Sequence, residues 1–214
     1  MRILAILFIF LQISFYSEGQ VAVNTMNIVY RGIPNSMSFG FFGYDCKNVQ
    51  MQVDTGSVTF FEEPDQCGSF LYSAPDSGNI ANFTFFAKTK KGARQIYKAK
   101  FRIKDLPAPT AYIGGINVGE INISNLRVQQ GMISRIEGMD ICADFRIDSF
   151  SYVIMRNEKA IIVGKNIGAY FDNNFKSYVS ALEHKDKILF YNIFCQGPDR
   201  KIRKPETFEL TAVK

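Results

Sequence analysis

The sequence contains no tryptophan and a single histidine, His184. Histidine is the side chain most often used for general acid–base catalysis and is a common metal ligand, so its scarcity leaves few ways to build an active site. His184 stands in the charged run 183–186, which is typical of a solvated loop. The sequence has neither a nucleophile motif around a serine or cysteine nor an H-E-x-x-H motif. We therefore expect a protein that is not an enzyme, with no catalytic residue, no cofactor and no metal site.

Three features that resemble chemical motifs have simpler explanations. Asp140 and Asp144 are four residues apart, which on an extended strand separates them by about 13 Å, too far for a paired-carboxylate mechanism. The glycine-rich run 114–119 lacks the lysine and the strand-to-helix setting of a phosphate-binding loop, so it predicts a turn. Asn82 and Asn122 match the glycosylation pattern, which matters only in a eukaryotic secretory pathway.

The sequence also lacks an apolar run long enough to span a membrane, which takes about 20 residues. The hydrophobic run 3–11 is about half that length and follows Arg2. Ser17 and Gly19 are small residues at the −3 and −1 positions of a cleavage site. We expect residues 1–19 to be a signal peptide that is removed, which makes the protein periplasmic or secreted, with no membrane span after cleavage.

The net charge is +5, with lysines and arginines spread along the chain apart from clusters at 88–94 and 200–204. Nucleic-acid binding needs a basic stripe on one face together with a motif that reads the bases. The simpler interpretation is an ordinary basic surface, so we expect no nucleic-acid partner.

Four cysteines, Cys46, Cys67, Cys142 and Cys195, follow the predicted signal peptide. An even number in an exported chain predicts disulfides, and three pairings are possible. Proximity in the sequence favours Cys46 with Cys67 and Cys142 with Cys195. No C-x-x-C spacing is present, so zinc binding and redox catalysis have little support.

Abundant phenylalanine and tyrosine, with many valines, isoleucines and threonines, favour strands over helices. Seven short segments are separated by turn residues, as in an immunoglobulin-like β-sandwich, which we expect over residues 20–104. The segments are 27–31, 36–42, 49–53, 57–61, 69–73, 81–89 and 95–103. The last two flank a basic turn at 90–92 and predict a hairpin.

Pro107 and Pro109, followed by Gly114 and Gly115, predict a junction between two tandem domains. The second domain, 105–214, is expected to be α+β, with an antiparallel sheet and one or two short helices. The expected strands are 132–136, 140–156, 159–163, 187–195 and 207–213.

Two segments are candidates for the one or two helices of this second half. Ser124 predicts an N-cap for a helix that runs through Gln130 and stops at Gly131. The apolar residues Phe175, Tyr178, Val179 and Leu182 fall on one face of a helix within 172–182.

Two local features of the strands are also predicted. A break in the alternation near Asp148 predicts a β-bulge. A turn at 197–200 connects the last two strands as a hairpin. Extended aromatic stretches such as 30–32 are candidates for strand addition to another chain.

Segments along the whole mature chain resemble the third and fourth periplasmic domains of the GldM/PorM family of the Bacteroidetes type IX secretion and gliding apparatus. These segments are Met26–Asn35, Phe101–Gly115, Gly131–Asp140, Phe145–Ser151, Lys187–Asp199 and Arg203–Lys204. The resemblance implies a non-catalytic role, protein partners in the cell envelope that include an outer-membrane-associated secretion ring, and a homodimer. It also implies a periplasmic location and supports the expected junction.

The sequence departs from that family because it has neither the family's membrane anchor nor its first two periplasmic domains, and its cysteines are not part of the family pattern. We expect an accessory or stand-alone interaction module that cannot by itself carry force from an inner-membrane motor. The alternative hypothesis is a secreted ligand-binding or inhibitor protein that reuses the scaffold, with loop 62–68 as its variable surface.

Overall fold

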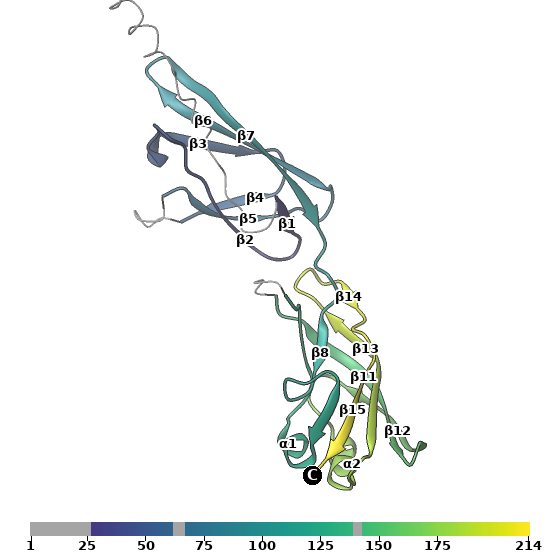
Figure 1. The fold of residues 1–214 in the computed structure, drawn as a ribbon. Coiled ribbons are helices and arrows are strands. Elements are labelled where there is room, and N and C mark those ends of the chain that lie inside the picture. The colour runs from purple at the N-terminus through teal and green to yellow at the C-terminus, as the bar shows by residue number, and fades with distance from the viewer. Residues whose placement is uncertain (1–26, 62–66, 139–142) are drawn as a thin grey trace, which may run out of the picture. The chain divides into compact units, whose positions relative to one another are not determined.

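The computed structural model describes residues 27–61, 67–138 and 143–214 (Figure 1). The predicted signal peptide lies outside these residues. The chain divides into two compact units. The first contains residues up to Val29 and Pro34–Ile103, and the second contains Tyr30–Ile33 and Lys104–Lys214. The expected domain limits, 20–104 and 105–214, stay a prediction, and the structure adds Tyr30–Ile33 to the second unit.

The first unit contains two sheets, with strand orders β1-β7-β6-β3 and β2-β5-β4. Strands β3, β6 and β7 pair antiparallel, and so do β2, β5 and β4. This arrangement confirms the expected mainly β, sandwich-like fold. The elements are β1 (Ile28–Tyr30), β2 (Asn35–Ser38), the 3-10 turn η1 (Cys46–Asn48), β3 (Val49–Val53), β4 (Ser57–Phe60), β5 (Ser69–Ser73), β6 (Ile80–Thr89) and β7 (Gly92–Lys104).

Aromatic side chains fill the space between these two sheets. On β6, Phe83 and Phe85 alternate with more exposed residues and are fully buried. The ring of Phe83 meets those of Tyr72 and Phe101 edge to face, with centroids 5.0 and 5.2 Å apart. This geometry is favourable for aromatic pairs, and the residues come from both sheets, so the contacts hold the sandwich together.

The second unit is built on a six-stranded sheet with the order β12-β11-β13-β15-β9, and β14 pairs with β13. A separate ribbon of β8 and β10 accompanies this sheet. The elements are β8 (Thr110–Tyr112), β9 (Gly119–Asn122), α1 (Ile123–Val128), β10 (Ile133–Arg135), β11 (Arg146–Arg156), β12 (Lys159–Ile167), α2 (Asn173–Ser180), β13 (Lys187–Gln196), β14 (Ile202–Arg203) and β15 (Phe208–Val213).

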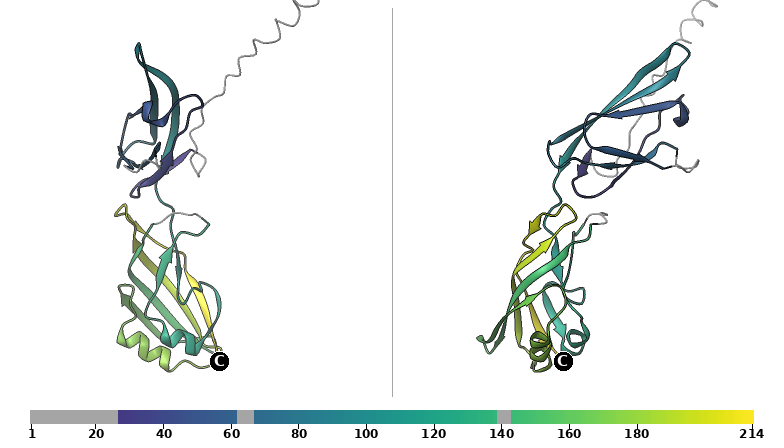
Figure 2. Two further views of the ribbon diagram at one scale, coloured as in Figure 1. Left: turned by 90° about the vertical axis from the view of Figure 1, so that its left-hand side faces the viewer. Right: turned by 180° about the vertical axis from the view of Figure 1, so that it is seen from behind.

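The two helices contribute to one core. Figure 2 shows α1 and α2 at the same end of the sheet as the C-terminus. Phe175 of α2 packs edge to face against Tyr152 and Phe150 of β11, with ring centroids 4.7 and 6.2 Å apart. Leu126 of α1 joins the same buried cluster. This half therefore has the expected α+β layout, with helices on one side of a sheet.

The second helix begins where the sequence predicted, because the carboxylate of Asp172 accepts the N–H of Phe175 at 2.7 Å as an N-cap. The predicted N-cap of the first helix was wrong. The side chain of Asn122, not Ser124, accepts the N–H groups of Ser124 and Asn125 at 2.8 and 3.4 Å.

The first helix also ends earlier than predicted. Gln129 is already extended, so the helix stops at Val128 and Gly131 is not its cap. Starting at Ile123 buries both Ile123 and Leu126 on one face, and this tertiary burial decides the register.

Strand pairing confirms the hairpin β6–β7, and β13 pairs antiparallel with β15. The predicted hairpin through the turn 197–200 was wrong in its second strand, because this turn joins β13 to β14. The predicted bulge near Asp148 is confirmed by register shifts on either side of Ser149. The sheet is not purely antiparallel, since β9 pairs with β15 in parallel. The predicted strand 36–42 is shorter, because β2 ends at Ser38 and Phe41 forms an isolated bridge with Tyr44.

Residues Tyr30–Ile33 join the second unit through several contacts. The N–H of Arg31 donates to the carbonyl of Lys104 at 3.0 Å, and its guanidinium pairs with Asp105 at 2.8 Å. Gly32 has a φ of +80°, and a Cβ added there would lie 2.6 Å from the Cα of Asp199. These contacts bind the stretch within its own chain, but β1 is an end strand of its sheet, so strand addition at 30–32 stays a prediction.

We expect Gly32→Ala to destabilise the second unit by roughly 3 kcal/mol, because the new methyl group is both strained in φ and overlapped by Asp199. Gly168→Ala is the matched control. Gly168 has a φ of +82° and no atom within 4 Å of an added Cβ, so this change should cost only about 1 kcal/mol. Urea unfolding of both variants measures the difference, and equal losses would show that the contact with Asp199 is unimportant.

Candidate functional site: a protein-interaction surface

The residues considered for catalysis are not assembled into a site. His184 is exposed after α2, and Asp144 is exposed before β11. Asp140 lies outside the described residues. Gly114 and Gly115, with φ of +58° and +81°, form the predicted turn, closed by the bridge between Ile113 and Ile116.

The two glycosylation motifs have structural uses. The amide of Asn82 donates to Asp54 at 2.6 Å. Asn122 caps α1. Neither asparagine needs a modification to explain its place.

Of the four candidate disulfide cysteines, Cys46 and Cys67 are bonded to each other. The thiol of Cys195 is free and buried, in contrast to its expected bond with Cys142, which lies outside the described residues. Burial raises the pKa of Cys195 to about 11, so its thiol is a weak nucleophile at neutral pH. Among residues that the structure describes, Asp45, Cys46 and Cys67 are the one group close enough to hold a metal, but the two sulfurs are already bonded.

The most buried ionic contacts belong to the second unit. The guanidinium of Arg203 donates to both carboxylate oxygens of Asp199 at 2.7 and 2.5 Å, and its Nε donates to the carbonyl of Leu106 at 3.1 Å. Arg203 and Asp199 are 9% and 4% exposed. The carboxylate of Asp105 binds Lys201 and Arg31, each at 2.8 Å. We call Arg31, Asp105, Asp199, Lys201 and Arg203 the arginine cluster.

Cationic partners hold these carboxylates in the charged form. Hydrogen bonds from Arg203 keep the pKa of Asp199 below its usual value, and Lys201 and Arg31 do the same for the pKa of Asp105. At the far end of β11, Arg156 lowers the pKa of the buried Asp186. Such paired carboxylates cannot exchange protons near neutral pH, so these contacts stabilise the fold and offer no acid or base.

The solvent side of the six-stranded sheet offers a different kind of surface. Val153 of β11 lies directly opposite Val163 of β12 and Leu189 of β13. Their neighbours Tyr152 and Ile154 are buried on the helix side, so the three aliphatic side chains lie on the other face. Val163 is 67% exposed and Ile167 is 71% exposed. We call Val153, Val163, Ile167, Leu189 and Tyr191 the open sheet face, and Ser151 and the exposed Lys165 lie among them.

Beside this face, β12 is the last strand in the sheet order. An end strand presents backbone N–H and C=O groups that can pair with a strand of another chain. The sequence signal for this site was the alternation of Ile161, Val163 and Ile167 with other residues. Sequence reasoning missed it because the predicted strand stopped at 163.

A different kind of surface feature, a hollow, lies in the first unit between the edge strands β3 and β4. Its volume is about 630 Å³, and it is lined by apolar side chains, the disulfide and polar side chains that include Lys47, Gln50 and Gln52. The lining includes Phe39, Met51, Phe60 and Phe61. It is large enough to hold part of a small apolar ligand.

A family model described as the GldM C-terminal domain matches residues 107–213, which make up most of the second unit. The chain belongs to the GldM C-terminal domain family. This membership confirms the resemblance for the second half and associates the chain with gliding and type IX secretion. The resemblance of the first half to the third GldM domain stays a prediction.

Comparisons with curated proteins and with solved structures add no information on the function of this GldM-type chain. No curated protein matches it. It is similar in structure to the adhesin InvE of Yersinia pseudotuberculosis (10% identity, TM-score 0.27, 91% of this chain and 58% of that one). It is also similar to cadherin domains 1–4 of protocadherin gamma B7 (9% identity, TM-score 0.31, 92% of this chain and 51% of that one). A third similar structure is SGBP-B of Bacteroides ovatus (10% identity, TM-score 0.26, 89% of this chain and 44% of that one). The chain spans about half the length of these structures, and the TM-scores are too low to bear on function.

No helix among the described residues of this GldM-type chain is long and apolar enough to cross a membrane.

Stability of the GldM-type unit should fall in acid. Asp199 has a lowered pKa when folded, so its pair with Arg203 stabilises the fold above the unfolded pKa of about 3.9, and this stabilisation is lost as pH falls through the folded value. We expect Asp199→Asn to cost on the order of 3 kcal/mol at pH 7 and much less near pH 2.

Urea unfolding at both pH values gives this comparison, and Asp144→Asn, which changes an exposed carboxylate, is the control. An Asp199→Asn cost that did not change between pH 7 and pH 2 would contradict the role of the ion pair.

Proposed function

We propose that this GldM-type chain is a non-catalytic, exported protein-interaction module of the cell envelope, an accessory of the gliding and type IX secretion machinery. Family membership supports the setting. The observation that carries the role is the open sheet face, an apolar surface next to an end strand of the sheet.

The partner is an envelope protein that adds a strand to β12 and covers the aliphatic side chains. Strand addition supplies backbone hydrogen bonds, and alternate side chains such as Val163 and Ile167 give the pairing its register. Burying aliphatic side chains that are now more than half exposed adds the non-directional part of the affinity. A component of the outer-membrane-associated secretion ring fits this description, and a second copy of the chain is the other candidate occupant.

The experiment is to isolate the protein from a native envelope with and without Val163→Glu. A charge at the centre of an apolar interface must be desolvated without a partner, so recovery of the bound protein should fall by about tenfold or more. Val118→Glu is the matched control, because Val118 is 71% exposed and lies outside the open sheet face.

Light scattering on the same samples identifies a second copy as the occupant if Val163→Glu converts a dimer into a monomer. Equal recovery with both variants would exclude the open sheet face. A lone monomer that recovers no envelope component would contradict the proposed function.

A secreted ligand-binding protein is the second candidate, and the hollow of about 630 Å³ between β3 and β4 favours it. In that case native mass spectrometry of the exported protein should show a retained apolar molecule. Phe60→Ser should release this molecule, because Phe60 lines the hollow and is 49% exposed, so its loss should leave the core intact. A spectrum with only the mass of the protein would count against this candidate.

A further inference from the structure

Residues 88–104 contain eight lysines and arginines and no acidic residue. They form the end of β6, the hairpin turn and the whole of β7. Like charges at this density repel one another, and nothing in sandwich formation requires them. The positions of these cations on the sheet indicate what kind of ligand they could bind.

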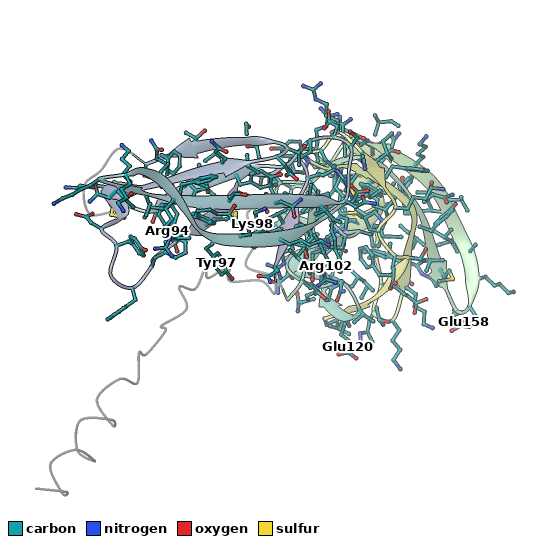
Figure 3. All side chains as sticks on the ribbon, turned by 90° about the horizontal axis from the view of Figure 1, so that it is seen from above. Arg94, Tyr97, Lys98, Arg102, Glu120 and Glu158 are labelled. Atoms are coloured by element: carbon teal, nitrogen blue, oxygen red, sulfur yellow. A yellow bond between two sulfur atoms is a disulfide. The ribbon has the colours of Figure 1, made fainter. Side chains whose placement is uncertain are left out.

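Strand β7 directs three of the cations to the same side. Lys98, Lys100 and Arg102 are exposed, whereas Phe101 and Ile103 are buried in the sandwich core. Alternate residues on a strand are about 6.8 Å apart, so the three charges form a line on the outer face of the sheet. Figure 3 labels Lys98 and Arg102 on this strand. Within 27–61, 67–138 and 143–214, none of the three is paired with a carboxylate in an ion pair.

Neutral polar side chains and one carboxylate, that of Asp54, lie next to this line. Thr84 of β6 is directly opposite Lys98 on one side and Gln52 of β3 on the other. Asn82 is opposite Lys100, and Asp54 holds its amide at 2.6 Å. Together these residues line a shallow hollow of about 430 Å³.

An aromatic ring continues the same surface. Phe86 is half-buried and stands between Gln50 of β3 and Gln95 of β7. Its neighbour Phe85 is fully buried in the core, so Phe86 lies on the outer side. A ring between two amides can pack against the apolar side of a sugar while the amides bind its hydroxyls.

We propose that this outer face of the first unit binds an acidic polysaccharide. The lysines and arginine pair with its repeated carboxylates or other anionic groups, and the amides and the threonine hydroxyl bind its sugar hydroxyls. We call Gln50, Gln52, Thr84, Phe86, Lys98, Lys100 and Arg102 the basic sheet face. It differs from the open sheet face in residues and in chemistry.

Other anions fit this surface less well. Strand β6 pairs with β7 on one side and with β3 on the other, so an acidic peptide cannot add to it as a strand. On its other side, β7 is paired only with the three-residue strand β1, so poly-L-glutamate is included in the test below as the peptide rival. An anionic membrane is usually bound by cations combined with large apolar side chains that insert, and Ile80 is the exposed aliphatic residue at this part of β6.

The test uses the purified exported protein and polygalacturonate, a polymer of uronic acid, with dextran as the neutral polymer. We expect retardation in a gel that contains polygalacturonate and none in a dextran gel. The triple variant K98Q/K100Q/R102Q should bind at least about tenfold more weakly, since it removes the three charges in line. The control K159Q/K176Q/K214Q removes the same charge from exposed positions in the second unit and should change little.

A second pair of measurements separates a sugar site from a purely electrostatic one. Q50A/Q52A leaves the charge unchanged and should weaken polygalacturonate binding several-fold. Poly-L-glutamate and vesicles of phosphatidylglycerol with phosphatidylcholine are the rival anions. The proposal is overturned if either rival binds as tightly as polygalacturonate, if Q50A/Q52A has no effect, if both charge triples weaken binding equally, or if polygalacturonate does not bind.

Discussion

The buried ion pair between Arg203 and Asp199 joins parts of the chain that are far apart in the sequence. Arg203 lies on β14, and its guanidinium reaches the turn at 197–200 and also the carbonyl of Leu106, which follows the first unit. The backbone of Asp199 in turn lies against Gly32. Because a buried charge without its partner costs several kcal/mol, these three segments are held together or lost together. This contact therefore acts together with those of Arg31 to hold residues 30–33 in the second unit.

Whether a contact joins residues that are near or far apart in the sequence explains where sequence reasoning succeeded and where it failed. The bounds of β3, β5 and α2 follow from local alternation, turn residues and a capping aspartate, and they were predicted within a residue or two. The parallel strand β9 depends on partners about 90 residues away on β15, so no local pattern reveals it. For the candidate surfaces, the cations of 88–104 were visible in the sequence. Their alignment on one face became clear only with the register of β6 and β7.

The open sheet face follows from the size of the helices. A sheet has two faces, and α1 and α2 have only six and eight residues, which come together at one end of one face. The aromatic cluster around Phe150 and Phe175 fills that side, while the other side keeps Val163 and Ile167 more than half exposed. Lys165 lies between Val163 and Ile167 on this side. Exposed aliphatic side chains on an end strand of a sheet are typical of an interface. The unit is thus stable through its covered face and available for partners through the other.

The two proposed surfaces can act without interfering, because different forces govern them. Charged contacts such as those of Lys98 and Lys100 weaken as salt shortens the screening length, which is about 8 Å at physiological ionic strength. Aliphatic contacts such as those of Val163 do not depend on charge, and many salts strengthen them. A chain that holds a protein through one unit and an acidic polymer through the other can therefore release the polymer as ionic strength rises while it keeps the protein. This separation follows from the chemistry of the two sheets and needs no coupling between the units.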